Sequence, residues 1–84
     1  MFLHVVRATP LRDYLLRLEF DDGAVRDVDL SGELHGEVFE PLRDRAFFAQ
    51  VMVNPETGTV EWPNGADFAP EFLSGLGREV QRVA

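Results

Sequence analysis

The sequence predicts a small α+β domain, in which an antiparallel sheet of about five strands is covered on one face by a C-terminal amphipathic helix and one or two short helical turns. Two observations predict this class. Strand-like runs separated by turn residues fill most of residues 3–62, and the one long stretch of helical periodicity lies at residues 70–83. The 84 residues leave room for one hydrophobic core, so residues 1–84 are expected to form a single domain.

The N-terminal part of the chain is expected to supply three strands. Residues 3–8 are rich in β-branched side chains, and residues 9–13 should form the loop after this first strand. Residues 14–20 alternate between faces, and the side chains expected on one face are Tyr14, Leu16, Leu18 and Phe20. The Asp-Asp-Gly tripeptide at residues 21–23 is a tight-turn signal, so residues 24–30 should return as the antiparallel partner. In that strand two side chains should face inward, Val28 and Leu30, and two outward, Asp27 and Asp29.

The middle of the chain combines short helical turns with a second hairpin. One helical turn should pack on the sheet through Val38, Phe39 and Leu42, and a second, at residues 45–48, has a suitable N-cap in Asp44. Residues 51–53 and 59–62 should then pair as strands across a turn at residues 54–58. Within the returning strand, Val60 and Trp62 should face the same way.

Residues 70–83 form the one long helix that the sequence predicts, and Pro70 suits its first turn. The expected apolar stripe of this helix consists of Phe72, Leu73, Leu76, Val80 and Val83. Gly75 and Gly77 each weaken a helix by about 0.5–1 kcal/mol relative to alanine. The helix should therefore depend on docking against the sheet rather than on propensity.

The charge of the protein is concentrated in one segment. The net charge is −7, and residues 19–40 carry all of it, because eight acids there face a single arginine while the rest of the chain balances. The eight acids are Glu19, Asp21, Asp22, Asp27, Asp29, Glu33, Glu37 and Glu40. Direct nucleic-acid binding is disfavoured, because phosphate neutralisation needs clustered Lys or Arg, whereas a basic protein partner would be attracted. The alternative is that the acidic segment only keeps a small domain soluble.

The composition also bears on compartment and assembly. The chain has no cysteine, which excludes disulfides and thiolate metal ligands. The apolar run at residues 2–6 is too brief for a signal-peptide core or a membrane span, so we expect a cytoplasmic location and no membrane partner. Nothing indicates a cofactor. An exposed sheet edge on so small a domain favours a homodimer as one arrangement.

Residue types that usually carry catalysis are sparse, and the sequence favours a protein that is not an enzyme. The histidines lack a second ligand at metal-binding spacing, the serines lie outside nucleophile contexts, and lysine is absent. These candidates are His4, His35, Ser31 and Ser74. Asp27 and Asp29 could bind a divalent cation or act as acid and base, but a solvated outer sheet face explains them more simply.

Residues 61–70 hold the strongest local constraints in the chain. The residues concerned are Trp62, Pro63, Asn64, Gly65 and Asp67. Each has a structural role available: a buried indole whose N–H needs an acceptor, a strand end, a turn with positive φ, and a side-chain acceptor that closes the turn or caps the next helix. Asp67 beside Trp62 is also the best single candidate for a ligand site, although its structural explanation is stronger.

Several segments taken together resemble a bacterial family, the domain of unknown function 2442. The resemblance lies in residues 13–23, 28–30, 38–44, 47–48 and 62–67, and its most specific element is the block Trp-Pro-Asn-Gly-Ala-Asp at residues 62–67. It implies an α+β fold with an antiparallel sheet and no established activity. Genes of the family often lie beside those of another small uncharacterised family, an arrangement similar to a toxin–antitoxin pair, and some relatives carry an added helix-turn-helix domain.

Three hypotheses for function follow. The leading one is a non-enzymatic protein-interaction module, antitoxin-like, that binds a small basic protein; its expected contact residues are Asp21, Asp22, Asp27, Asp29, Glu33 and Glu37. The alternative is an acidic inhibitor that mimics nucleic acid and occupies the basic groove of a DNA- or RNA-binding effector. The third is an enzyme, which would need a pocket where Asp67 and Trp62 converge with His35 or Tyr14.

Overall fold

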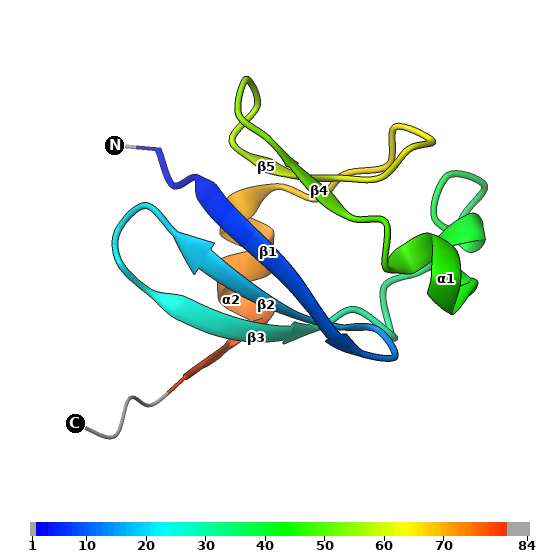
Figure 1. Ribbon diagram of the computed structural model, residues 1–84, viewed down its shortest axis with the longest axis horizontal. Coiled ribbons are helices and arrows are strands. Elements are labelled where there is room, and N and C mark those ends of the chain that lie inside the picture. The colour runs from blue at the N-terminus through cyan, green and yellow to red at the C-terminus, as the bar shows by residue number, and fades with distance from the viewer. Residues whose placement is uncertain (1, 81–84) are drawn as a thin grey trace.

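The computed structural model describes residues 2–80, and its largest element is an antiparallel sheet with the strand order β1-β2-β3-β6 (Figure 1). Three of these strands follow one another in the chain: β1 (Val5–Arg12), β2 (Leu15–Phe20) and β3 (Val25–Asp29). The short strand β6 (Arg78–Glu79) pairs with the other edge of β3. A separate two-stranded sheet consists of β4 (Met52–Asn54) and β5 (Thr59–Glu61). The predicted α+β class with antiparallel strands is confirmed, but the expectation of one sheet of about five strands is wrong.

The helices are short and lie against the sheets. They are the 3-10 helix η1 (Glu40–Arg43) and the α-helices α1 (Arg45–Phe48) and α2 (Pro70–Leu76). In Figure 1, α2 lies behind the larger sheet, and α1 lies at the side where β1 turns into β2. Asp44 caps α1 as predicted, because its Oδ1 accepts the backbone N–H groups of Ala46 and Phe47 at 2.9 and 3.3 Å.

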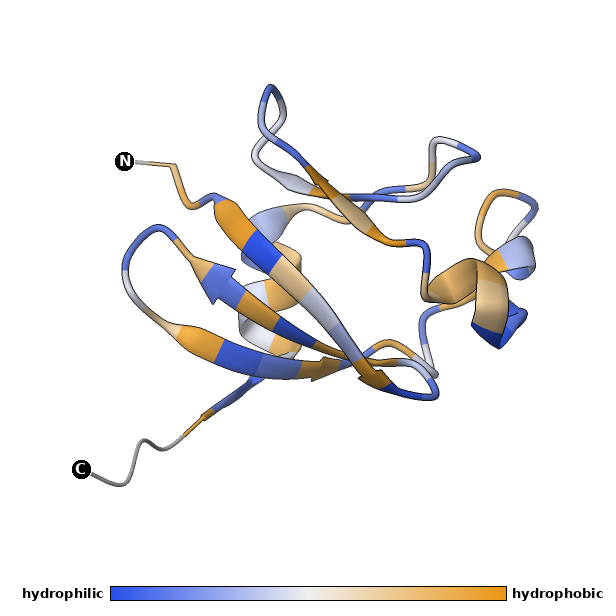
Figure 2. Ribbon diagram, in the orientation of Figure 1, coloured by the Kyte–Doolittle hydropathy of each residue, from blue (hydrophilic) through white to orange (hydrophobic). Residues whose placement is uncertain are grey.

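Hydrophobic and hydrophilic residues are interspersed along β2 and β3 (Figure 2), and the hydrophobic side chains bury one face of the larger sheet. Five of the six residues predicted to face inward are in the core: Leu16, Leu18, Phe20, Val28 and, directly after β3, Leu30. Tyr14, the sixth, lies in the turn before β2 and is only partly buried. The rest of the core comes from β1, the helices, β5 and the connecting segments, through Val5, Leu34, Leu42, Phe48, Val60, Trp62, Ala66 and Leu73. One hydrophobic cluster therefore joins both sheets and all three helices.

β1 is longer than the sequence predicts. A loop was expected at residues 9–13, but the strand continues to Arg12 and reaches β2 through a turn at Asp13 and Tyr14. Asp13 takes the left-handed backbone conformation, with a φ of 46°. Pro10 is accommodated because β1 lies at the edge of the larger sheet, and the strand pairing is irregular between Pro10 and Arg12.

α2 is shorter than predicted, because the chain leaves the helix at Gly77. A Cβ atom at this position would lie 2.8 Å from Cγ2 of Val28 and 2.9 Å from Cβ of Arg26, so only glycine lets the backbone pass so close to β3. Beyond it the backbone pairs with β3 instead of continuing the helix, and the N–H of Val80 donates to the carbonyl of Val25 at 2.9 Å. Val83, the last residue of the predicted stripe, lies outside the described residues.

The predicted apolar positions of the helical segments are only partly buried. Leu73 is fully buried, whereas Phe72 and Leu76 are 43% and 39% exposed. In the segment before η1, Val38 is 50% exposed, while Leu42 within η1 is fully buried. A helix of two turns docks through a single row of side chains, so the residues beside that row stay at the surface.

Candidate functional site

The outer face of β2 and β3 pairs acids of residues 19–40 with arginines from outside that segment. Arg17 stands opposite Asp27 in the strand register, with Nε 2.8 Å from Oδ1 and Nη2 3.1 Å from Oδ2. These hydrogen bonds lower the pKa of Asp27 and raise the pKa of Arg17. Beside them, Nε of Arg7 lies 3.4 Å from Oε2 of Glu19. On this face the negative charge is partly balanced within the protein itself.

The two acids of the β2–β3 turn are engaged in local hydrogen bonds. The Asp21 carboxylate accepts the backbone N–H of His4 at 3.0 Å and lies 2.8 Å from His4 Nδ1. The backbone hydrogen bond from His4, and after it the side-chain bond, holds the pKa of Asp21 below its usual range. The neighbouring Asp22 accepts the N–H of Ala24 at 2.9 Å, as expected for a tight turn. The turn is thereby fastened to the segment that precedes β1.

The remaining acids lie between the end of β3 and the start of η1, both end residues included. Asp29 accepts the N–H of Ser31 at 2.9 Å, and this bond lowers the pKa of Asp29. Glu33 is half-buried, and Glu37 and Glu40 are exposed. Within residues 2–80, none of these three glutamates has a side-chain hydrogen bond or an ion pair. The predicted contact residues therefore divide into an internally paired group and an unpaired group.

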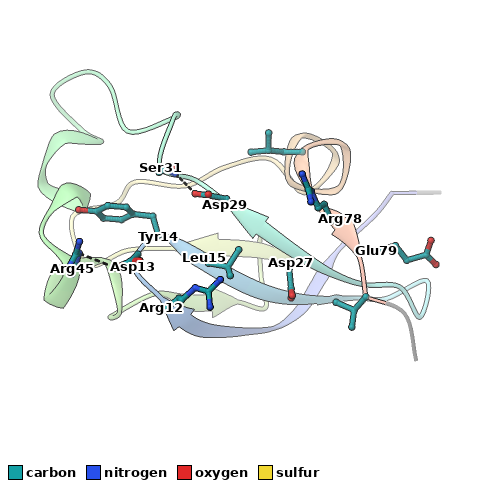
Figure 3. Close-up of a pocket in the computed structure, with 12 residues that line it drawn as sticks. Arg12, Asp13, Tyr14, Leu15, Asp27, Asp29, Ser31, Arg45, Arg78 and Glu79 are labelled. Carbon is teal, nitrogen blue, oxygen red and sulfur yellow. Dashed lines mark hydrogen bonds and ion pairs between the residues drawn. The ribbon is translucent and has the colours of Figure 1, made fainter. Parts of the chain in front are cut away.

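An open groove of about 760 Å³ lies beside Asp27 and Asp29 (Figure 3). Three arginines and four acids contribute to its wall: Arg12, Arg45 and Arg78, and Asp13, Asp27, Asp29 and Glu79. One pair within the wall is direct, with Arg45 Nε 3.3 Å from Asp13 Oδ1. The mixture of charges suits a polar ligand better than a strongly anionic or cationic one.

Sequence reasoning missed the arginines of this groove. They are far apart in the chain and come together only because β1 turns into β2 beside α1 and because β6 pairs with β3. Of the charged pairs on the outer sheet face and in the groove, only Arg17 and Asp27 could have been placed opposite each other from the sequence. The tight turn at residues 21–23 sets the register of the hairpin, and that register places residue 17 opposite residue 27.

The motif at residues 62–67 forms a compact corner. The indole of Trp62 is buried and donates to the carbonyl oxygen of Phe48 at 2.8 Å, as its predicted need for an acceptor requires. Gly65 has a φ of 86°, and its N–H donates to the carbonyl of Trp62 at 2.9 Å. Asn64 accepts the N–H of Ala66 at 3.1 Å and donates to the carbonyl of Val38 at 2.8 Å. Pro63 is exposed and lies two residues after the end of β5, close to the strand end that was expected there.

Asp67 does not have the structural role that the sequence indicated. Asn64 closes the turn instead, and α2 begins after Ala69 without a side-chain cap. Asp67 is exposed, and its backbone forms an isolated antiparallel bridge with Glu61. Its carboxylate forms no hydrogen bond to any other residue of the described part of the chain.

The residues proposed for an enzyme do not converge in the groove. Tyr14 lines it and donates its hydroxyl proton to the carbonyl of Arg43, but Asp67, Trp62 and His35 are not among the lining residues. His35 Nε2 lies 2.9 Å from the carbonyl oxygen of Gly32. Between residues 2 and 80, no three His, Asp or Glu side chains are grouped so as to hold a metal ion.

Both the fold and the corner motif agree with the resemblance found in the sequence. The protein is a small α+β domain, and it belongs to the family described as "Protein of unknown function (DUF2442)", whose pattern matches residues 5–78. Neither a curated protein nor a solved structure matches the chain. Across residues 2–80, the helices are too short or too polar to cross a membrane.

Proposed function

We propose that this protein is a non-enzymatic interaction module that binds a basic protein partner through its acidic segment, residues 19–40. The observation that carries this proposal is a contrast within the segment. Glu19 and Asp27 each form an ion pair with an arginine and Asp21 is hydrogen-bonded to His4, whereas Glu33, Glu37 and Glu40 have no such partner among residues 2–80. Exposed carboxylates without an internal counter-charge attract cationic groups of a partner and speed the encounter with it.

The scaffold supports this use of the segment. Leu34, between two of the unpaired glutamates, is fully buried, and the hydrogen bond from Asn64 to the carbonyl of Val38 fastens the segment to the corner motif. A surface that is already ordered loses less conformational entropy on binding. The particular role that we propose is the neutralising partner of a small basic protein, in the manner of an antitoxin.

Mimicry of nucleic acid has less support. A phosphate mimic needs rows of carboxylates that are not balanced by nearby cations. On the outer sheet face, Arg17 and Arg7 lie against Asp27 and Glu19 and interrupt any such row. The mixed charges of that face fit recognition of a protein surface better.

Charge-matched variants test the proposal. The double variant E37Q/E40Q removes two unpaired carboxylates, and the control E56Q/E61Q removes two carboxylates of the β4–β5 hairpin, outside the acidic segment and the groove. Calorimetry against the purified product of the adjacent gene should show affinity lower by about two- to thirtyfold for E37Q/E40Q at low salt, since exposed ion pairs contribute about 0.2–1 kcal/mol each. The control should bind like the wild type. If both double variants bind the adjacent gene product equally well, or if the wild type does not bind it, this protein does not recognise that product through its acidic segment.

A further inference from the structure

We infer that an aromatic patch beside the acidic segment is the docking surface for a basic amphipathic helix of the partner, an inference that rests on the function proposed above. The aromatic patch consists of Val38, Phe39, Phe68 and Phe72. Val38 and Phe72 are about half exposed, and Phe39 and Phe68 are partly buried. These residues come from the segment before η1, the segment before α2, and α2 itself.

Ring stacking joins the three phenylalanines of the patch. The Phe68 ring stacks on Phe39, with centroids 4.8 Å apart, and on Phe72, with centroids 5.7 Å apart. It also meets the buried Trp62 edge-on at 5.9 Å. Phe68 therefore joins the exposed rings to the hydrophobic core, and rings already held in place lose little freedom when a partner covers them.

Carboxylates accompany every residue of the patch along the chain. Glu37 precedes Val38, Glu40 follows Phe39, Asp67 precedes Phe68 and Glu71 precedes Phe72. All four acids are exposed, and none takes part in the ion pairs found among residues 2–80. An apolar centre accompanied by acids is complementary to a segment with apolar anchors and flanking Lys or Arg.

The same charges argue against other occupants. A second copy of this chain would bring its own acids against the first, and each copy has a net charge of −7. An anionic membrane surface would be repelled for the same reason. A cationic protein segment is the occupant that both the rings and the carboxylates favour.

The spacing of the patch fits a helix. The centroid separations of 4.8 and 5.7 Å are close to the rise of one α-helical turn, about 5.4 Å. Side chains one turn apart on a docking helix would thus meet successive rings. Apolar anchors one and two turns apart are the usual pattern of helices bound in grooves.

A designed peptide tests this docking surface on the full-length protein. The probe is a synthetic helix about five turns long, with leucines on one face and lysines on the other. The variant Phe72→Gln removes an exposed ring of the patch, and Met52→Gln is the control, because Met52 on β4 is a large apolar side chain of similar exposure, 51% against 43%. Fluorescence anisotropy should show binding weaker by about fivefold or more for Phe72→Gln and unchanged for Met52→Gln. Amide chemical shifts of the wild type should change at residues 37–40 and 67–72.

The outcomes separate this inference from the proposed function. If E37Q/E40Q weakens peptide binding and Phe72→Gln does not, the docking surface is wrong and acidic recognition stands. If neither E37Q/E40Q nor Phe72→Gln weakens peptide binding, or if the peptide does not bind the wild type, the docking surface and the acidic recognition are both wrong. Shift changes confined to the outer face of β2 and β3, or self-association that Phe72→Gln abolishes, would also overturn the docking surface.

Discussion

The indole Nε1 of Trp62 donates a hydrogen bond of 2.8 Å to the backbone carbonyl oxygen of Phe48. The two rings lie 5.5 Å apart, and both side chains are fully buried. This contact joins the corner motif to the end of α1, although 14 positions separate the two residues in the chain. The tryptophan of the family motif thus has a defined structural role.

Trp62→Phe should destabilise the protein, because it leaves the Phe48 carbonyl without its donor in a buried site. The expected loss is about 1–3 kcal/mol for the unsatisfied carbonyl, with an added cost for the smaller ring. Urea unfolding followed by circular dichroism measures it. The control Met52→Leu changes an exposed side chain of β4 and should alter the free energy of unfolding by less than about 0.5 kcal/mol. A similarly small change for Trp62→Phe would contradict the role of the hydrogen bond.

The glycines of the C-terminal region provide a matched pair of variants. Gly77→Ala places a Cβ atom within 3 Å of Val28 and Arg26, so it should destabilise the protein by about 1–3 kcal/mol. Gly75→Ala meets no atom within 4 Å and lies inside α2, so it should stabilise by about 0.5–1 kcal/mol. Thermal unfolding distinguishes the two. Equal shifts in the melting temperature would mean that the close approach of Gly77 to β3 does not constrain the fold.

Local signals predicted the parts of the fold in which neighbouring residues determine the conformation. The Asp-Asp-Gly turn set the β2–β3 hairpin, and strict alternation identified Leu16, Leu18 and Phe20 as core residues. Asp44 was recognised as a cap because the cap and the N–H groups it satisfies are at most three residues apart.

Contacts between distant segments explain what the sequence did not predict. α2 ends where Gly77 comes close to β3, which lies about fifty positions earlier in the chain. The helix propensities of the neighbouring residues do not indicate that contact. The balance of charge on the outer sheet face could be derived only from the hairpin register. The stacking of Phe39 on Phe68 depends on the path of the whole segment between them, so no sequence spacing could indicate it.

Two exposed aspartates should differ in their effect on stability. Asp44→Ala removes the acceptor of two backbone N–H groups in α1 and should cost about 1 kcal/mol. Asp67→Ala removes a carboxylate that forms no hydrogen bond with the other described residues, and should change the free energy of unfolding by less than about 0.5 kcal/mol. Denaturant titration of both variants tests this pair. A large loss for Asp67→Ala would restore a structural role for that side chain.

The contact between Asp21 and His4 should make stability depend on acid pH. Hydrogen bonds from His4 lower the pKa of Asp21 in the folded protein below its ordinary value of 3.8. The unfolded chain, in which Asp21 has its ordinary pKa, binds the proton more readily than the folded protein does. The stabilisation that the Asp21 carboxylate gives the fold is therefore complete above pH 3.8 and is lost as the pH falls through the lower pKa of the folded state. Asp21→Asn should be less stable than the wild type at pH 7, and the difference should shrink as the pH falls below about 4. Urea unfolding between pH 7 and 2 measures this. The control Asp22→Asn keeps the contact between Asp21 and His4, so its stability should follow the wild-type pH profile. If the free energies of unfolding of Asp21→Asn and the wild type differ by the same amount at every pH, protonation of Asp21 is not linked to stability.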